Sequence, residues 1–589
     1  METASDQLGS ERAAGVLASA GAWLAGSGEQ LLVLTSPDSV GANTAAALLA
    51  AEAAAGRPAA GAMIHAQGSA AGGGARTLAW ILAAQLGYCV STPAELCRRL
   101  EVDERPVTLL ISEYAEEGGG QASGGSLADL LLRPLLSVHR VRLVLACGST
   151  VPDLGGVTGT VLSIAPSTAV GAGLLPSRAD TAARFDEVGI VAACTTDPVG
   201  LSIAVERAWP DLDPLRRAQW DCFGQALTTV EPDPAQVVPL LATAALATGD
   251  TALLDHVRAQ ISVPGAEDSA SIRYWPRWAR WWRSPDVSSA DAASWIGSVG
   301  ALANAWGRGS DRGPADAVEP QGEEVLMAAD SIGRLHCLDP ANGAVLARLD
   351  SPTVRVSAMA ALAAGRILLA DPTGALELAG RSMQEDAHAP SIEDLLDPDH
   401  DQKSHDHAVL EGLSELAGGC AVTAIGAQAD RFVAIGRADG FAALFDAVHR
   451  RPLATPAQLH FGRVTAIAVH ADSAGVPAGA LTLVSGGEDC RLIESTVADG
   501  RIAITREIAS RPTSLLAVDV VASSNEGVLV AAGWSDGLVT LHERVEGLEW
   551  SPRGSWSLGW APAGLCWAAG GSTLTIGGAY GLLAFDLNG

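Results

Sequence analysis

Apolar runs and helical patterns alternate along the first 150 residues of the chain. Four apolar runs are typical of short buried strands, at residues 31–35, 60–68, 105–117 and 141–149. The stretch after the first run is rich in alanine, and residues 76–87 repeat their apolar side chains with helical spacing. Strands that alternate with helices predict a parallel, doubly wound sheet, whose ligand site lies at the carboxyl ends of its strands.

The second half of the chain repeats one pattern: an apolar strand, a small turn with Asp or Gly, and a second short strand. The copies begin near residues 325, 367, 432, 481, 528 and 573. A further apolar strand lies between successive copies, for example at residues 464–469. About four strands per copy predict a β-propeller of six blades, or of seven if one copy has diverged. Asp439, Asp489 and Asp536 occupy turns, where aspartate stabilises a tight reversal.

Composition limits the classes of function. The 589 residues predict several domains, and a net charge of −29 with a pI near 4.7 argues against nucleic acid or an anionic membrane as a partner. Nine scattered cysteines without a Cys-x-x-Cys pair favour a reducing cytoplasm. The first residues, METASDQ, contain no basic region, so we expect no secretory signal, and we expect no membrane span. These features predict a cytoplasmic protein.

The segment LLVLTSPDSVGAN (31–43) has the outline of a phosphate-binding loop, which uses the pattern Gly-x-x-x-x-Gly-Lys-Ser/Thr. Aligned without a gap, Ser36 replaces the first glycine, Gly41 keeps the second, Ala42 replaces the lysine and Asn43 the hydroxyl. A shift of one residue places Asn43 and Thr44 at the lysine and hydroxyl positions instead. Neither alignment supplies a cation, because the only lysine of the chain is Lys403.

From about Gly9 to Trp282 the chain resembles a STAND-type signalling NTPase, on the segments GSERAAGVLASAGAWL, LLVLTSPDSVGAN and VTLLISEYAEE. The family usually shows two aspartates and a glutamate after the last of these strands, at positions that match Ser112, Ala115 and Glu116. Only Glu116 is acidic, and the arginine usual after the next strand is missing. Hydrolysis needs that charge for electrostatic stabilisation, so we expect no ATPase.

Two interpretations of this loop stay open. It is either a strand-to-helix turn capped by Asp38 or Ser39, or a weak nucleotide site. We expect no cofactor and no metal. If nucleotide binding persists, the resemblance implies a degenerate site made of Ser36, Gly41, Asn43, Thr44 and Glu116.

Residues 201–312 are expected to be mainly helical, and LLDHVRAQISVPGAEDSASIRYW resembles the winged-helix segment that follows such NTPase cores. A dense aromatic cluster follows. Trp275, Trp278 and Trp282 would share one face of a helix. Such a stripe belongs either to a core or to a partner-binding surface, and we take Trp278 and Trp282 as candidate interaction residues.

The repeats resemble the WD40 class through their turns, although no copy ends in Trp-Asp. Trp534 beside Asp536 is a candidate interface anchor, with packing between blades as the alternative. The widest gap between copies holds an acidic insert near residues 384–413, with His400, His405 and His407, which we expect to be a mobile loop without a metal.

The fold class we predict is multidomain, α/β plus all-β: a degenerate P-loop NTPase-like sheet (1–200), a helical and winged-helix region (201–312) and a six- or seven-bladed propeller (316–589). The predicted function is a non-catalytic scaffold or sensor, a pseudo-NTPase whose propeller face binds protein partners. The resemblance implies a setting in bacterial conflict or immune signalling. Alternatives are a switch that binds ATP or ADP without efficient hydrolysis, and an enzyme that uses the propeller channel. The oligomeric state stays open.

Overall fold

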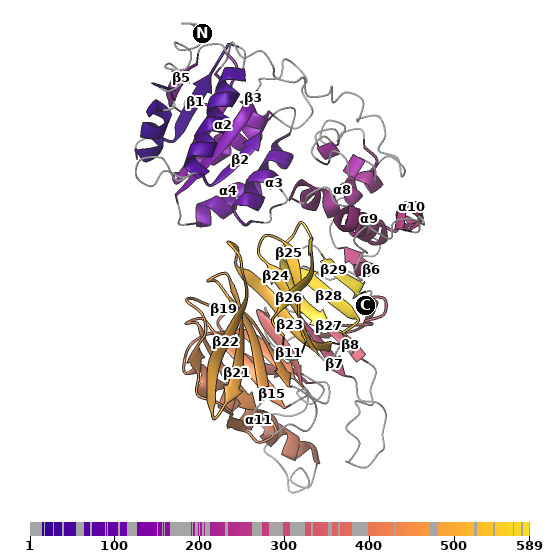
Figure 1. Ribbon diagram of the computed structural model, residues 1–589. Helices are drawn as coiled ribbons and strands as arrows, with labels where there is room; N and C mark the ends of the chain where they lie inside the picture. Colours follow the sequence, from indigo (N-terminus) through magenta and orange to yellow (C-terminus); the bar gives the residue numbers. More distant parts are fainter. Residues whose placement is uncertain are drawn as a thin grey trace. The chain divides into compact units, whose positions relative to one another are not determined.

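The computed structural model of the chain describes residues 15–587 with gaps (Figure 1). The longest gaps are residues 165–189, 262–273, 282–298, 307–323 and 380–397, and shorter ones include 38–39, 55–63 and 115–125. The chain divides into two compact units, Met1–Val237 and Val238–Gly589. Within the described part of the chain, none of the helices combines the length and the apolar composition that a membrane span requires.

The first unit contains a parallel five-stranded sheet in the order β2-β3-β4-β1-β5. Its strands are β1 (Leu31–Thr35), β2 (Ala66–Ser69), β3 (Val107–Tyr114), β4 (Val141–Cys147) and β5 (Thr160–Ser163). Strands β1, β3 and β4 fall within three of the apolar runs and β2 overlaps the end of the fourth, and the parallel pairing confirms the prediction of a parallel sheet. After β1 the chain crosses to the β2 edge, whereas after β4 it returns past β1 to the β5 edge. Such a reversal beside β1 and β4 is where α/β sheets place ligand sites.

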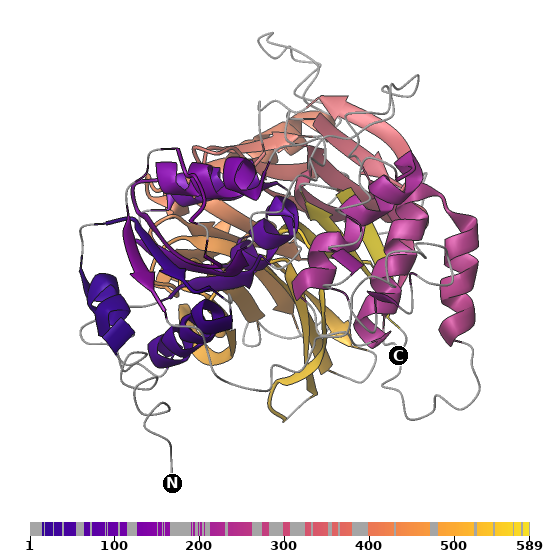
Figure 2. The same ribbon diagram turned by 90° about the horizontal axis from the view of Figure 1, so that it is seen from above.

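Helices cover both faces of this sheet (Figure 2). They are α2 (Val40–Ala54), α3 (Ala75–Gln85), α4 (Pro93–Val102), the π-helical turn η1 (Ala128–Leu132) and α5 (Arg133–Ser137). The apolar core on the α2 side joins Leu32, Leu34 and Val144 of the sheet to Ala42 and Ala46 of the helix. The helical pattern of residues 76–87 is confirmed by α3.

Three further helices follow: α8 (Pro214–Thr229), α9 (Pro234–Thr248) and α10 (Thr251–Ile261). Helix α8 packs on α3, where the rings of Trp80 and Trp220 lie 6.4 Å apart. Arg76 of α3 also pairs with Asp221 of α8 at 3.1 Å. The first unit therefore continues past residue 200, because α8 belongs to its core.

The second unit contains six antiparallel sheets, and their first strands β7, β11, β14, β19, β23 and β27 touch one another in a closed ring. The unit is therefore a six-bladed β-propeller, and the open choice between six and seven blades is decided as six. Each repeated copy in the sequence forms the central hairpin of one blade. Blade 1 consists of β7 (Val299–Trp306), β8 (Glu324–Asp330), β9 (Arg334–Leu338) and β10 (Val345–Asp350), and blade 2 of β11 (Ala358–Leu362), β12 (Arg366–Ala370) and β13 (Leu376–Ala379). Blade 3 consists of β14 (Val422–Gln428), β15 (Phe432–Arg437), β16 (Phe441–Asp446), β17 (Arg451–Pro452) and β18 (Ala457–Gln458), and blade 4 of β19 (Val464–Ala471), β20 (Leu481–Gly487), β21 (Arg491–Ala498) and β22 (Arg501–Ser510). Blade 5 consists of β23 (Leu515–Ser523), β24 (Gly527–Trp534), β25 (Leu538–Val545) and β26 (Ser551–Ser557), and blade 6 includes β27 (Pro562–Trp567), β28 (Thr573–Gly578) and β29 (Gly581–Leu587).

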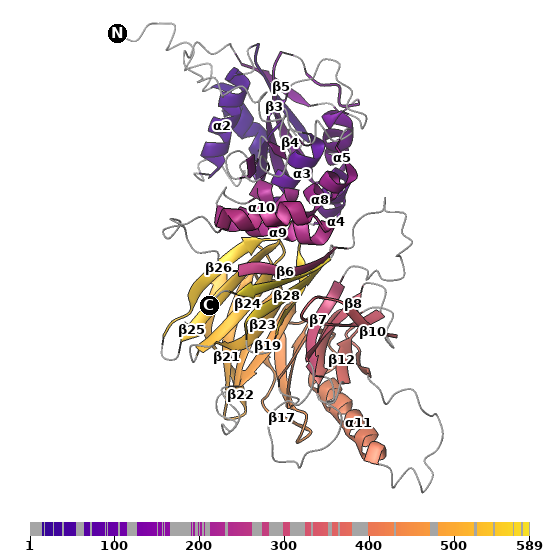
Figure 3. The ribbon, with the colours of Figure 1, turned by 90° about the vertical axis from the view of Figure 1, so that its right-hand side faces the viewer.

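Blade 6 is completed by β6 (Tyr274–Trp281), which pairs antiparallel with β29 (Figure 3). The predicted aromatic helix is therefore wrong: these residues form a strand, because pairing with β29 satisfies their backbone and buries Tyr274 and Trp278. The propeller accordingly starts at Tyr274 rather than at residue 316. Of the predicted winged-helix hairpin, residues 259–261 end α10 and residues 262–273 lie outside the described part.

Blade 2 has three described strands, and a helix packs beside it. Helix α11 (Pro398–Ala417) contacts β13 and β16, and Figure 3 shows it against the outside of the propeller. Its Val409 and Leu413 are buried in the core shared by blades 2 and 3. The expectation of a mobile loop is therefore wrong for residues 398–413, because their apolar positions repeat with helical spacing. The rest of the predicted insert, residues 384–397, lies outside the described residues.

Candidate functional site

The loop after β1 places its polar side chains differently from a gap-free phosphate-binding loop. Ala42 is fully buried in the apolar core between α2 and the sheet. The position assigned to lysine in the gap-free alignment therefore faces the core. The next side chain, Asn43, reaches the end of β3, where its Oδ1 accepts a hydrogen bond from the backbone N–H of Glu113 at 2.8 Å. The side chain of Asn43 is therefore engaged by the backbone at the end of β3.

Glu113 lies in a β-bulge at the carboxyl end of β3. Between Ile111 and Tyr114 the pairing with β4 loses register, so β3 carries one residue more than its neighbour. Glu113 adopts a φ of 57°, a left-handed conformation that is uncommon outside glycine. Bulges and left-handed residues occur at the edges of sheets next to functional sites. Here the backbone of the bulge is held by Asn43, so the amide oxygen of Asn43 already has a structural partner.

Of the other residues of the predicted nucleotide site, the three that the structure describes, Ser36, Gly41 and Thr44, are uncharged. Ser36 is buried and its N–H donates to the Cys147 carbonyl at 3.3 Å. Gly41 lies in the first turn of α2, and Thr44 is exposed on the same helix. Glu116 lies outside the described residues. Within the described residues no group of His, Cys, Asp and Glu is arranged to hold a metal ion.

The tryptophans of β6 have a packing role where they are described. Trp278 is buried against blades 1 and 6, and its Nε1 donates to the Pro340 carbonyl at 2.9 Å. The structure therefore corrects the assignment of Trp278 to a partner surface, since its ring fills the seam that closes the propeller. Trp282, the other candidate, lies outside the described residues.

Trp534 is also a core residue. Its ring is fully buried between blades 4 and 5, its Nε1 donates to Thr540 Oγ1 at 3.0 Å, and the Arg511 guanidinium lies over the ring. Asp536 pairs with Arg511 at 2.7 Å and accepts the Leu538 N–H at 3.2 Å. Trp534 is therefore not a surface anchor, and the alternative of packing between blades describes it. Asp439 and Asp536 each accept a backbone N–H of their own turn, from Phe441 at 3.4 Å and from Leu538, which is the role that the sequence predicts.

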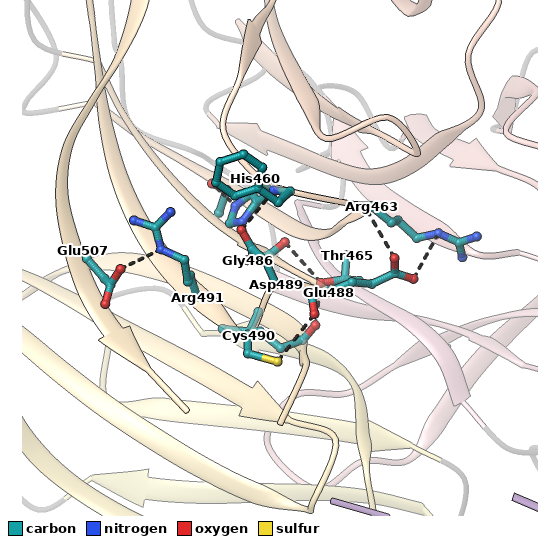
Figure 4. A network of polar contacts seen from close by, with 12 residues as sticks. His460, Arg463, Thr465, Gly486, Glu488, Asp489, Cys490, Arg491 and Glu507 are labelled. Carbon is teal, nitrogen blue, oxygen red and sulfur yellow. Dashed lines mark hydrogen bonds and ion pairs between the residues drawn. The ribbon is translucent and has the colours of Figure 1, made fainter. Parts of the chain in front are cut away.

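Blade 4 holds a network that the sequence did not reveal (Figure 4). His460, which precedes β19, contacts Asp489 Oδ1 through Nδ1 at 2.8 Å and Ser485 Oγ through Nε2 at 2.9 Å. Asp489 Oδ2 also accepts the backbone N–H of Phe461 at 3.1 Å. We call His460, Ser485 and Asp489 the blade 4 network. Three residues from different elements were not expected to meet, because no spacing in the sequence predicts it.

The blade 4 network has the residue types of a hydrolase triad, but Ser485 and His460 are buried beneath the turns and have no access for a substrate. Burial lowers the pKa of His460, against the opposing effect of Asp489. The imidazole bridges a carboxylate and a hydroxyl, so it joins the loop before β19 to the β20–β21 hairpin. The network therefore fixes the shape of the surface above it.

That surface carries exposed side chains. Phe461, directly after His460, is 79 % exposed. Arg463 pairs with Glu488, and Arg491 Nε donates to Glu507 Oε2 at 2.6 Å. Figure 4 shows Arg463 and Arg491 on opposite sides of His460 and Asp489. This surface, on the turn side of blade 4, is the candidate functional site of the propeller.

Comparisons with known proteins give likenesses to solved structures alone. No protein-family model matches the chain, and no curated protein matches it. The chain is similar to the Myceliophteria thermophila Cps50 (Swd1) β-propeller domain, with 15 % identity, a TM-score of 0.32, and coverage of 49 % of this chain and 84 % of that one. It is also similar to the RRP9 WD40 repeats (12 %, TM-score 0.32, coverage 53 % and 97 %) and to U3-55K (12 %, TM-score 0.31, coverage 52 % and 98 %). The closed ring of six sheets, rather than these distant likenesses, identifies the second unit as a six-bladed β-propeller.

Proposed function

We propose that this chain is a non-catalytic scaffold or regulatory protein. In this proposal the propeller binds a protein partner, and the first unit is a pseudo-NTPase that keeps a sheet and loop without phosphate chemistry. The observation that supports the proposal is the arrangement of two side chains after β1: Ala42 faces the core, and Asn43 accepts a hydrogen bond from the Glu113 backbone. Neither of these two side chains supplies a cation to balance a triphosphate.

The propeller supports the binding half of the proposal. A ring of paired sheets protects its strand edges and presents turns whose sequence varies without disturbing the core. The turns of blade 4 are fixed by buried hydrogen bonds, so binding there costs little conformational entropy. The resemblance of the first unit to signalling NTPases favours a setting in bacterial conflict or immune signalling.

Partner capture tests the binding half. The tagged full chain is crosslinked in native cells, partners are identified by mass spectrometry, and the purified partner is then titrated against three chains: full length, residues 1–237 and residues 262–589. We expect the last of these to bind as the full chain does, provided that it melts cooperatively. A fragment that starts at residue 316 is unsuitable, because it lacks β6 and β7. Full binding by residues 1–237 would reject a propeller scaffold.

Calorimetric titration with ATP and ADP, with and without magnesium, tests the pseudo-NTPase half. We expect no binding tighter than the millimolar range, since Asn43 and Thr44 offer only neutral groups. Micromolar affinity for either nucleotide would overturn this half in favour of a nucleotide-gated switch. ATP turnover abolished by Asn43→Ala would point to an enzyme.

A further inference from the structure

The most exposed aromatic side chain among the described residues lies on the turn side of blade 4. Phe461 is 79 % exposed, whereas the large aromatic side chains Trp534, Trp556 and Trp560 are fully buried. Leaving a phenylalanine ring in water forgoes about 2 kcal/mol of burial. An exposed ring at the centre of a polar rim is also the usual form of an interface anchor.

The loop that carries Phe461 is fixed in place. The N–H groups of Leu459 and His460 both donate to the Gly440 carbonyl, at 3.0 and 3.2 Å, and the Phe461 N–H donates to Asp489. Arg463 N–H donates to Glu488 Oε2 at 3.3 Å. Gly440 has a φ of 86°, and a Cβ there would clash with the His460 carbonyl. The ring is therefore presented by a preorganised loop, which lowers the entropy cost of binding.

Two guanidinium groups flank the loop. Each is held by a carboxylate at its Nε edge: Arg491 by Glu507 at 2.6 Å, and Arg463 by Glu488 at 3.7 Å. No hydrogen bond from the terminal nitrogens of either arginine is present within the described residues. The terminal edge of an arginine is a fork that binds a carboxylate with two parallel hydrogen bonds. Arg463 and Glu488 are about half exposed, so this fork is accessible to a partner.

The charge around the loop differs from that of the whole chain. The chain has a net charge of −29, yet residues 431–510, which include most of blades 3 and 4, contain equal numbers of acidic and basic residues. The general field of the protein repels an acidic partner, but this region has no formal net charge to add to that repulsion. Two arginine forks beside an apolar anchor complement carboxylates next to an apolar side chain.

We propose that Phe461, Arg463 and Arg491, the Phe461 patch, bind an acidic peptide segment of a protein partner, with an apolar side chain of that segment against the Phe461 ring and its carboxylates on the two arginines. This proposal rests on the proposed scaffold function and names the chemistry of its partner. The two guanidinium groups would donate hydrogen bonds to the bound segment, and the Phe461 ring would provide an apolar surface for it.

Fluorescence polarisation of the full chain with labelled synthetic peptides tests the patch. The probe has a leucine and phenylalanine core flanked by glutamates, and its counterparts carry glutamines or lysines in place of the glutamates. We expect saturable binding of the acidic peptide alone, weakened by added salt because the contacts are charged. Phe461→Ala should weaken binding about thirtyfold, and Arg463→Gln or Arg491→Gln about tenfold each.

Matched controls come from blade 5. Leu548 is 63 % exposed and Arg553 pairs with Glu543 at 3.1 Å, so Leu548→Ala and Arg553→Gln remove an exposed apolar side chain and an exposed arginine elsewhere. Both should change affinity by less than about twofold. All variants should keep the melting temperature of the parent, because Phe461 contributes little to the core.

Several outcomes would overturn the proposal: no binding of the acidic peptide up to millimolar concentration, equal binding of the lysine peptide, or full binding by Phe461→Ala. Displacement of the peptide by a short oligothymidylate would show that the arginines serve nucleic acid instead. These failures are separate from failure of the scaffold function, since partner capture by residues 262–589 would persist if the partner used another face.

Discussion

The end of β3 in the first unit and the turn side of blade 4 both have polar side chains at the ends of strands. The two regions differ in the hydrogen-bond partners of these side chains. At β3, Asn43 meets the backbone of Glu113. In blade 4, the polar groups of His460, Ser485 and Asp489 meet one another in the interior. In the first arrangement the amide oxygen of Asn43 is occupied by the backbone of its own unit. The second lies beneath the surface and leaves Phe461 and two arginines to face outward.

The difference teaches that residue types alone do not mark a site. In a loop with the outline of a nucleotide site, the Asn43 side chain and the Ser36 N–H bond to the backbone of the adjacent sheet. A Ser-His-Asp set with hydrogen-bonding geometry is buried beneath a turn and joins the loop of His460 to that turn. Function in both regions depends on which groups remain accessible after the fold has satisfied its own hydrogen bonds.

The largest expected effect is a loss of stability when lysine is introduced at position 42, compared with lysine at position 43. Ala42→Lys would place an ammonium in the apolar core between α2 and the sheet, so it should destabilise the first unit by about 3 kcal/mol or more. Position 43 faces the end of β3, so Asn43→Lys should destabilise the first unit less. We expect this variant not to hydrolyse ATP. Urea unfolding and a phosphate-release assay check both. A stable Ala42→Lys chain with turnover would show that the gap-free alignment is correct after all.

The next effect separates two turn aspartates. Asp489→Ala leaves the His460 ring and the Phe461 N–H without their acceptor, which should cost about 3 kcal/mol. Asp439 occupies the same turn position in blade 3, but it is more exposed and pairs with Arg437, so Asp439→Ala should cost less than about 1 kcal/mol. Differential scanning calorimetry measures the propeller transition. Equal losses would contradict a special role for the blade 4 network.

A third effect is acid sensitivity of the propeller. Burial lowers the pKa of His460, and it lowers the pKa of His542 to about 4. Below pH 6.5 the unfolded chain therefore binds more protons than the folded chain, so the stability that these histidines contribute is complete above pH 6.5 and is lost as pH falls. For His542 the loss extends toward pH 4. For His542 the loss is about 3 kcal/mol.

Burial has the opposite consequence at Asp519, because it raises the pKa of that carboxyl to about 6 and favours the folded state as pH falls below 6. Melting temperatures between pH 7 and 4 check the balance, with His542→Gln as the variant that flattens the histidine slope and Asp519→Asn as the variant that steepens it. Identical slopes in all three chains would rule out this account.

The smallest expected effect concerns the bulge at β3. Asn43→Ala removes the acceptor of the Glu113 N–H and should destabilise the first unit by about 1 kcal/mol. Glu113→Gly relieves the left-handed conformation at φ 57° and should stabilise it by a similar amount. Chemical denaturation of both variants and of the double variant shows whether the bond and the strain are coupled. Destabilisation by Glu113→Gly would mean that the glutamate side chain supports the bulge.

The sequence predicted the elements that depend on local pattern. Apolar runs gave β1, β3 and β4, and the repeated strand–turn–strand copies gave the central hairpin of every blade, because period-two burial and turn chemistry are local. The tryptophans of residues 275–282 were misread as a helix, since their spacing fits a helical face. Their true state depends on β29, about 300 residues away, whose open edge pairs with them.

The amino-acid sequence by itself determined the α/β and propeller architecture, the lack of a lysine near the loop and the structural role of the turn aspartates. Only the tertiary structure decided that the ring has six blades, that Ala42 faces the core and that Trp278 and Trp534 are buried. It also joined His460 to Ser485 and Asp489, which lie 25 and 29 residues further along the chain. The physical reason is that accessibility and long-range pairing depend on which distant segment covers a residue, and no local pattern encodes that neighbour.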